Sequence, residues 1–489
     1  MQLIDLIIVL GYLIVSAAIP WFVSGRQKNK EDFLMAGRKM HWLPVTLSGV
    51  AAGFSAISLL GTPGFVLAHD LRYLQTLIVG LLSLPIMYFW VAPFIYRLRI
   101  VSIYEFLEQR FCPGLRYFAS FLFMLSKLGY LAVVIYAPAM TLNVMTGQPI
   151  WVFILLFSVV SALYAMMGGL EGVMWCNVMQ YAIIVVGITA AVLFFFDGNM
   201  SQYLDVAVKA GKTRCFDFSF DFKSLSFWVL LININLLGVA RSCSDQGSVQ
   251  QMCAARSLKD CLWSYVLATV FGMPIVLALY FLGICLFGYV NVTVSPPAEI
   301  MTAPDKIFPY VISHHMPTGV SGILLAAILA AGISSVSYVI HAMTSTFMVD
   351  VYEKLFKKSS DSPKYVLISR CVTLGWGMLA GGLAFYVMYL GNTIVEATAI
   401  VTSMVAAPLG GIFLLGIFTK FTNTVGVFVG GIAGTCVSVA TWWMNKHEMI
   451  EVNFMWFGVF SIVTTIVVGS LVSKLSAGGN CGSKTKVNS

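Results

Sequence analysis

The chain has 489 residues, of which 59% are hydrophobic and only 10% are charged, with a formal net charge of +8. Soluble domains carry about 25% charged residues, so this composition excludes a protein with an ordinary hydrated surface. We expect an all-α polytopic membrane protein, in which the excess of positive charge reflects membrane topology and is not a nucleic-acid-binding surface.

A membrane-spanning helix needs about 20 apolar residues, and such stretches recur along the chain. They predict thirteen transmembrane helices, at 4–22, 43–66, 74–96, 117–143, 150–167, 173–196, 226–246, 263–290, 319–347, 366–390, 394–418, 423–443 and 454–473. With the N-terminus outside, 20 of the 29 Lys and Arg residues fall on cytoplasmic segments. The positive-inside rule therefore predicts a cytoplasmic C-terminus and a multi-pass location in a plasma membrane or a cell inner membrane.

The predicted helices group into two units of five. The division is a first helix with its cytoplasmic loop, a first five-helix repeat, an extracellular loop, a second five-helix repeat, two C-terminal helices and a cytoplasmic tail, at 1–42, 43–196, 197–225, 226–418, 419–475 and 476–489. Five is odd, so tandem copies must have opposite membrane orientations, as in many transporters. No GxxxxGK[ST] phosphate-binding motif is present, so uphill transport would draw on an ion gradient.

Each unit begins with an interrupted span. The first contains Val50–Gly64, in which three glycines and Pro63 weaken the helical hydrogen-bond ladder. An unwound turn would expose carbonyl oxygens that suit a small cation, whereas close packing through small residues is the alternative. The second contains Gly238–Gln251, where an arginine and an aspartate interrupt the apolar run.

Small and polar residues also meet in Ala330–Ser335. The hydroxyls of Ser334 and Ser335 could bond back to carbonyls one turn earlier in their own helix. Paired with carbonyls of an unwound segment, they would instead form a neutral oxygen cage. Such a cage suits a monovalent ion, because a divalent ion prefers carboxylates.

Two cations lie within predicted spans, where each costs about 2.5–3.5 kcal/mol on insertion scales. Arg241 is followed four residues later by Asp245, which allows either a pair within one helix or a role for Arg241 in binding a substrate anion. We expect Lys127 to extend its side chain towards the cytoplasm.

The motifs, taken in order, resemble the sodium/solute symporter family over roughly 5–475. They are "LSGVAAGFSAISLLGTPGFVLAHD" (Leu47–Asp70), "RLRIVSIYEFLEQRF" (Arg97–Phe111), "VVIYAPAMTLNVMTG" (Val133–Gly147), "YAMMGGLEGV" (Tyr164–Val173), "AAGISSVSYVIHAMTSTFMVDVY" (Ala330–Tyr352) and "APLGGIFLLGIF" (Ala407–Phe418). The first and third are most similar to the iodide, monocarboxylate and multivitamin transporter branch. The resemblance implies the five-plus-five inverted repeat first described for a leucine transporter, with extra helices at both ends.

The resemblance also implies a sodium site between the first and eighth core helices. Its ligands would be the carbonyl oxygens of Ala51, Phe54 and Ala331 and the hydroxyls of Ser334 and Ser335. Some members hold a second ion with an aspartate after the "GGL" motif, where this chain has Asn177. Loss of that negative ligand predicts a single Na⁺.

Two departures from the family pattern concern the substrate. Tyr130 stands where sialic-acid-carrying members place an arginine, which argues against sialic acid. Arg241 stands where sugar-carrying members place a gating tyrosine, which favours an anion. The candidate substrate contacts are Gly53, Ser55, Ser58, Tyr130, Tyr136 and Arg241.

These observations predict a sodium-coupled secondary active symporter of a small, carboxylate-bearing organic solute that works by alternating access, and no enzyme. Its expected partners are the small-molecule substrate and the lipid bilayer, with no nucleic acid and no obligate protein partner. The alternatives are a non-transporting solute sensor or a sodium leak on the same fold, or a symporter for a neutral solute such as a sugar or an amino acid.

Overall fold

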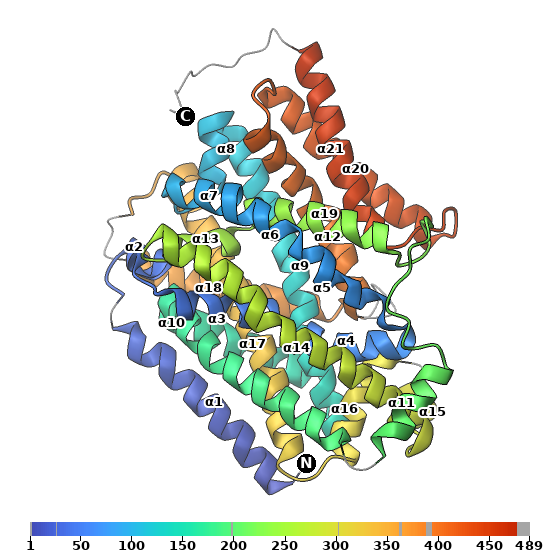
Figure 1. The fold of residues 1–489 in the computed structure, drawn as a ribbon. Coiled ribbons are helices and arrows are strands. Elements are labelled where there is room, and N and C mark those ends of the chain that lie inside the picture. Colours follow the sequence, from blue (N-terminus) through green and yellow to red (C-terminus); the bar gives the residue numbers. More distant parts are fainter. Residues whose placement is uncertain are drawn as a thin grey trace.

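The computed structural model describes residues 2–25, 27–196, 199–301, 303–360, 364–387 and 394–476. These residues are helical or irregular and contain no β-strand, apart from one isolated bridge between Met40 and Ala255. Figure 1 shows the helices packed side by side in one elongated bundle. The predicted all-α architecture is confirmed, whereas all but the first residue of the predicted tail at 476–489 lies outside the described residues.

The elements have the following bounds. The long helices are α1 (Leu3–Ser24), α9 (Pro113–Thr146), α10 (Ile150–Phe195), α12 (Phe227–Ser244), α14 (Leu258–Val292), α17 (Val320–Thr346), α18 (Tyr365–Ala384), α19 (Ile394–Phe418), α20 (Thr424–Lys446) and α21 (Met455–Leu475). The shorter ones are α2 (Lys30–Met35), η1 (Ala36–Arg38), α3 (Trp42–Gly53), α4 (Ala56–Ala68), η2 (Leu71–Leu74), α5 (Gln75–Leu81), α6 (Ser83–Ile86), η3 (Met87–Val91), α7 (Ala92–Leu98), α8 (Tyr104–Arg110), α11 (Met200–Lys209), α13 (Gln246–Ala254), α15 (Ala298–Met301), α16 (Pro304–His314) and η4 (Phe347–Leu355).

Ten helices in the described ranges are long and apolar enough to cross a membrane, or eleven if the bent pair α3 and α4 counts as one span. Helix α10 alone has 46 residues. At about 1.5 Å per residue it is more than twice as long as the hydrocarbon core of about 30 Å. Gly169 within it has φ 52° and ψ −159°, which breaks the helical path between the predicted spans 150–167 and 173–196. The multi-pass architecture is confirmed, and the count of thirteen stays a prediction.

Both interruptions predicted from the sequence are present. Helices α3 and α4 are bent by 49°, because Phe54 (ψ 83°) and Ser55 (ψ 171°) are not helical. Helices α12 and α13 are separated at Asp245, with φ −85° and ψ 112°. The Asp245 carboxylate then caps α13 by accepting a 3.2 Å hydrogen bond from the Ser248 amide.

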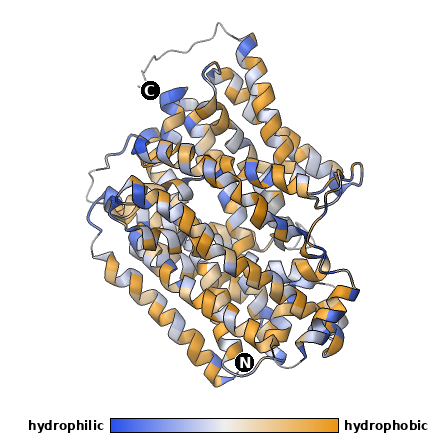
Figure 2. Cartoon of the chain, viewed as in Figure 1, coloured by the Kyte–Doolittle hydropathy of each residue, from blue (hydrophilic) through white to orange (hydrophobic). Residues whose placement is uncertain are grey.

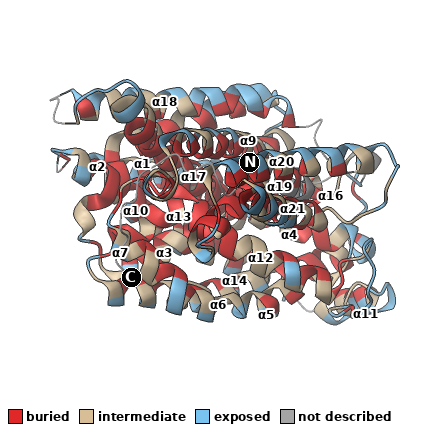
Figure 3. Ribbon diagram, turned by 90° about the horizontal axis from the view of Figure 1, so that it is seen from above, coloured by how far each residue is buried: buried red, intermediate tan, exposed pale blue. Residues whose placement is uncertain are grey.

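Helix α17 forms the centre of the bundle. Of the most apolar 18 residues in the span Val320–Leu355, 89% are buried, against 28% for α1 and for α18. Helix α17 packs against α1, α3, α4, α9, α10, α13 and α18. Figure 3 shows the buried residues gathered in the middle of the bundle and the exposed residues around it. A helix so enclosed can carry polar groups only where neighbouring helices satisfy them.

The outer surface is apolar, as a bilayer requires. Trp21 and Phe89 are each 68% exposed and lie on the outside of the bundle. Figure 2 shows hydrophobic residues along the lengths of the helices, with hydrophilic residues more frequent at loops and helix ends. Singly exposed apolar residues are common in any protein, but a whole belt of them indicates a lipid-facing surface.

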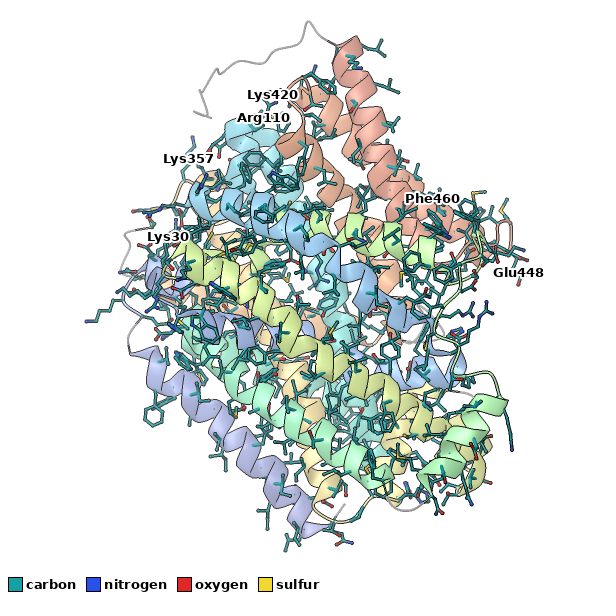
Figure 4. All side chains as sticks on the ribbon, in the orientation of Figure 1. Lys30, Arg110, Lys357, Lys420, Glu448 and Phe460 are labelled. Atoms are coloured by element: carbon teal, nitrogen blue, oxygen red, sulfur yellow. The ribbon has the colours of Figure 1, made fainter. Side chains whose placement is uncertain are left out.

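The predicted loops of the two membrane sides lie at different edges of the molecule. Figure 4 places Lys30, Arg110, Lys357 and Lys420, all from predicted cytoplasmic segments, along one edge. Glu448, from a predicted external segment, lies at the other side of the bundle. The arrangement of the helices therefore agrees with the predicted alternation of loops.

Candidate functional site: a sodium cage beside a charged cavity

The two serines of α17 face the broken helix. The Ser334 hydroxyl donates to the Ala51 carbonyl oxygen of α3 at 2.9 Å and to the Ala331 carbonyl oxygen at 3.0 Å. The Ser335 hydroxyl donates to the Ala52 carbonyl oxygen at 2.9 Å. All these side chains except that of Ala52 are fully buried. Both hydroxyls thus cross to α3, and only that of Ser334 also bonds back to its own helix.

Ser337 provides the contrast. Its hydroxyl bonds only to α17 carbonyl oxygens, those of Ile333 at 2.7 Å and Ser334 at 3.3 Å. That is the ordinary behaviour of a buried helical serine. The bonds from Ser334 and Ser335 to α3 therefore do not follow from serine chemistry alone, but from the position of these residues opposite the helix break.

The groups at this contact fit a small monovalent cation. The break at Phe54 and Ser55 interrupts the helical ladder, so carbonyls of the last turn of α3 have no partners further along their own helix. A serine hydroxyl can rotate and present either its proton or its lone pairs. The described residues hold no cluster of three or more His, Cys, Asp or Glu side chains that could bind a metal ion. Neutral oxygens in this number suit Na⁺ better than a divalent ion.

Four of the five predicted sodium ligands, Ala51, Ala331, Ser334 and Ser335, are thus brought together by α3 and α17. The fifth, Phe54, lies at the break itself, where its amide donates to the Val50 carbonyl oxygen at 2.9 Å. Its role as a ligand stays a prediction. On another side of α17, Gly332 allows close packing against α10, because a Cβ there would lie only 2.5 Å from the Phe157 ring.

The position expected for a second sodium ligand holds a neutral amide. Asn177 is fully buried on α10, and its amide nitrogen donates to the Ser48 hydroxyl at 3.1 Å. The neighbouring Cys176 thiol lies 3.7 Å from the Ser16 carbonyl oxygen. Neither residue carries a charge that a cation would need for strong binding, and the prediction of one ion stands untested.

A cavity of about 280 Å³ lies beside the second helix break. Phe123, Ser126, Lys127, Tyr130, Asn233, Ile234, Leu237, Gly238, Ala240, Arg241, Ser244, Asp245, Thr398, Thr402, Ala406, Ala407, Leu409 and Ile462 line it. Helices α9, α12 and α19 supply most of these residues, and the residue between α12 and α13 is Asp245. Two cations and one anion therefore line a single cavity.

The expectation for Lys127 is wrong. Its ammonium does not reach for the cytoplasm but forms an ion pair with the Asp245 carboxylate. Both residues are buried, at 8% and 6% exposure. The reason is that Asp245 lies at the break, where its carboxylate faces α9, and a buried charge is stable only beside its opposite. Lys127 also lies 5.5 Å from the Tyr130 ring centre.

Arg241 is left facing the cavity. Its Nε atom lies 3.8 Å from the Asp245 carboxylate, and its side chain remains 59% exposed deep within the bundle. Because Arg241 lines the cavity, this exposed surface faces the cavity space. The predicted i,i+4 pair with Asp245 is present but loose, since Lys127 already neutralises that carboxylate.

The remaining candidate substrate contacts do not all line the same cavity. Tyr130 lines the cavity with Arg241 and lies within hydrogen-bonding reach of Ser55. Gly53 instead lines a second cavity of about 390 Å³, between α3 and α14. Ser55, Ser58 and Tyr136 line neither of these two cavities. Sequence reasoning missed Ser126, Ser244 and Asn233, small polar residues with no distinguishing pattern.

Residues of the motif Arg97–Phe111 take part in a charge network with Arg116 and Asp350. The Arg116 guanidinium, 2% exposed, binds Asp350 at 2.5 Å and Glu108 at 2.5 Å. Asp350 also accepts hydrogen bonds from the hydroxyls of Ser102 at 2.9 Å and Ser120 at 2.5 Å. This network joins the loop before α8 to the base of α9 and to η4.

The last residue of this loop and the first residue of α8 contact the second helix break. The Tyr104 hydroxyl donates to the Ser244 carbonyl oxygen at 2.9 Å. The Ile103 amide donates to the Gln246 side-chain oxygen at 2.8 Å. Ser244 and Gln246 flank Asp245 on either side, so the loop contacts the residues that position the carboxylate in the cavity.

Two interrupted helices, an oxygen cage between the first of them and a buried helix, and a charged cavity beside the second define a cation-coupled secondary transporter. The family model "Sodium:solute symporter family" matches residues 33–434. The chain belongs to this family. Its predicted membership and its use of sodium-coupled symport are therefore confirmed.

Among known proteins, the chain is 30% identical over 451 residues to human sodium-coupled monocarboxylate transporter 1, covering 89% of this chain and 72% of that protein. It is 27% identical over 482 residues to the sodium/sialic acid symporter SiaT of Proteus mirabilis, covering 97% and 95%. A solved substrate-bound, outward-open Na⁺-coupled sialic acid symporter superimposes with a TM-score of 0.86 at 26% identity, covering 97% of this chain and 98% of that one. The family and these relatives are transporters, and the prediction that the chain is no enzyme stays a prediction.

Proposed function

We propose that this protein is a symporter that couples the entry of one Na⁺ to the uptake of a small organic anion bearing a carboxylate. The observation that carries the proposal is the position of the Arg241 guanidinium. It faces the cavity because the Asp245 carboxylate forms its close ion pair with Lys127. A planar guanidinium matches a carboxylate with two parallel hydrogen bonds. Two of the similar proteins also take acids by name, a monocarboxylate and a sialic acid.

Sodium coupling would act through the contact between α3 and α17. Na⁺ bound by Ala51, Phe54, Ala331, Ser334 and Ser335 would replace the direct hydrogen bonds from the serines to α3. The ion would thereby set the distance between the broken helix and the central helix. Whatever factor Na⁺ adds to substrate affinity, substrate must add to Na⁺ affinity. A membrane potential contributes about 2.3 kcal/mol per charge for each 100 mV.

The architecture in this proposal has thirteen spans, with α10 crossing twice around Gly169, and two inverted five-helix repeats. Their first members would be the two interrupted helices, α3–α4 and α12–α13. The N-terminus would be outside and the C-terminus in the cytoplasm. The Asn177 amide would leave the transporter with a single sodium ion per cycle.

The decisive experiment is a sodium-driven uptake panel in proteoliposomes that contain the full chain. Lactate, pyruvate, pantothenate, iodide, proline, glucose and sialic acid are each offered with an inward Na⁺ gradient or with choline in its place. A carboxylate accumulated above its external concentration only with Na⁺ supports the proposal. Accumulation of proline or glucose alone would identify a neutral-solute symporter. Sodium entry or substrate binding without accumulation would identify a leak or a sensor.

Substitution of Arg241 tests the assignment of the anion site. If Arg241→Ala costs a net of about 1.5–3 kcal/mol, the value of one hydrogen bond to a charged group, KM for the carboxylate should rise about ten- to hundredfold. Arg214→Ala is the matched control, because Arg214 is 57% exposed and also lies beside an aspartate, but on a predicted external loop. Unchanged KM in the Arg241 variant would remove the basis for an anionic substrate.

A further inference from the structure

A groove at the membrane-cytoplasm boundary is unrelated to the sodium cage and the charged cavity. It has a volume of about 440 Å³ and is formed where α3 and α14 begin. His41, Trp42, Arg256, Ser257, Lys259, Asp260, Trp263 and Leu267 line it. These residues lie at the ends of predicted spans, on segments predicted to face the cytoplasm.

The walls of the groove are fixed by backbone pairing. The Met40 amide donates to the Ala254 carbonyl oxygen at 3.0 Å, and the Arg256 amide donates to the Met40 carbonyl oxygen at 2.9 Å. These bonds join the residues just before α3 to those just before α14. The groove is therefore a preformed feature between two connected segments, not a gap between independent loops.

The charge in the groove is positive. Arg256 and Lys259 carry two positive charges against the single carboxylate of Asp260. That carboxylate is engaged by the Arg256 Nε atom at 2.8 Å and by the Ser257 hydroxyl at 2.7 Å. The bond uses only Nε, and the Arg256 side chain is still 56% exposed. The two terminal nitrogens of the guanidinium and the exposed Lys259 are thus available to an anion.

One face of α14 continues the groove into the membrane. Lys259, Trp263, Leu267 and Val270 follow one another at intervals of four, four and three residues, so they share a face of the helix. Trp263 is 48% exposed and Val270 is 58% exposed. The face therefore changes from a cation, through an aromatic ring, to aliphatic side chains. Tryptophan is typical of the level of lipid head groups.

We propose that this groove binds one anionic phospholipid. The phosphate of the head group lies against Arg256 and Lys259, and an acyl chain runs along Trp263, Leu267 and Val270. A soluble phosphate would use the cations but leave the aromatic and aliphatic part of the face uncovered. The order of residues along α14 matches a lipid, which has its charge at the water edge and its hydrocarbon at membrane depth.

Native mass spectrometry of the full chain in detergent tests the proposal with two lipids, phosphatidylglycerol and phosphatidylcholine. We expect one phosphatidylglycerol to be retained in preference to phosphatidylcholine. Lys259→Gln should weaken that binding about fivefold, the effect of one lysine of about 1 kcal/mol at an anionic surface. Trp263→Ala should also weaken it, because the ring no longer covers the lipid.

Lys420→Gln is the matched control, since it removes one exposed positive charge from another predicted cytoplasmic loop. It should leave retention unchanged. Equal retention of the two lipids, or equal losses from Lys259→Gln and Lys420→Gln, would show only a general attraction to the surface and overturn the proposal. Displacement of phosphatidylglycerol by inorganic phosphate, at an ionic strength matched with chloride, would also overturn it in favour of a phosphate site. Size-exclusion profiles like that of the unaltered chain establish that the variants are folded.

Discussion

The ion pair between Lys127 and Asp245 makes a quantitative prediction about both stability and transport. Lys127→Met replaces the buried ammonium by an apolar side chain of similar length and leaves the Asp245 carboxylate without its main partner. Removal of one member of a buried pair costs about 3–5 kcal/mol. Arg241 can offset part of this loss, because unit charges 3.8 Å apart attract by about 4 kcal/mol at an effective dielectric constant of about 20.

Since Arg241 is 59% exposed to the cavity, water screens much of that attraction. We therefore expect a net loss of about 2–3 kcal/mol in the free energy of unfolding. Recruitment of Arg241 by Asp245 would also withdraw the guanidinium from the substrate. If this withdrawal costs about 1.4 kcal/mol, KM for the carboxylate rises about tenfold.

The assays are thermal unfolding in detergent and sodium-driven uptake in proteoliposomes. The double variant Lys127→Met/Asp245→Asn is the comparison, because it removes both charges and should recover most of the stability that Lys127→Met loses. Arg241 would then have no competing carboxylate, so substrate affinity should recover as well. If Lys127→Met leaves both the unfolding midpoint and KM unchanged, the pair does not hold Asp245 away from Arg241 and the reasoning fails.

Three further predictions concern other parts of the molecule. Ser334→Ala/Ser335→Ala should abolish the sodium dependence of uptake, whereas Ser337→Ala, whose hydroxyl bonds only to α17, should keep it. Arg116→Met should lower the free energy of unfolding by about 3–5 kcal/mol, because it leaves the buried Asp350 carboxylate without its positively charged partner; an unchanged thermal midpoint would contradict this. At Asp217, burial raises the pKa but hydrogen bonds from its surroundings outweigh it, so the pKa lies below the ordinary 3.8. The ionised carboxylate then stabilises the fold above pH 3.8 and loses this effect as the pH falls through its folded pKa. The wild type should therefore be more stable than Asp217→Asn above pH 3.8, and this advantage should disappear below the folded pKa.

The contact between α3 and α17 could be predicted from the sequence better than the cavity, for physical reasons. Both helix breaks could be predicted, because glycine, proline and charged residues within apolar runs weaken a helix locally. The pairing of Ser334 with Ala51 depends on two distant segments, and only the order of motifs pointed to it. Without the resemblance, the sequence pattern favoured helix packing. The observed bonds to α3 place the two serines opposite the helix break, and their role as sodium ligands stays a prediction.

The error for Lys127 and the separation of Tyr136 from the cavity both depend on helix rotation. Tyr136 follows Tyr130 by six residues on α9, which is about 600° of turn and about 9 Å along the axis, so the two rings cannot share one small cavity. Lys127 precedes Tyr130 by three residues and therefore lies on the same face. Hydropathy shows that a span is apolar but does not show which face meets which neighbour. Opposite charges in two separate spans, Lys127 and Asp245, were the available signal for a pair.

The hydrogen bonds from Tyr104 and Ile103 to the two sides of Asp245 have a mechanical consequence. They make the start of α8 and the loop before it a direct connection between the charged cavity and the Arg116 network. If α13 rotates, the start of α8 and the loop before it must either move with it or lose their hydrogen bonds to Ser244 and Gln246. This connection therefore couples any movement of the cavity wall to a movement of the Arg116 network, over a path that contains none of the five predicted sodium ligands.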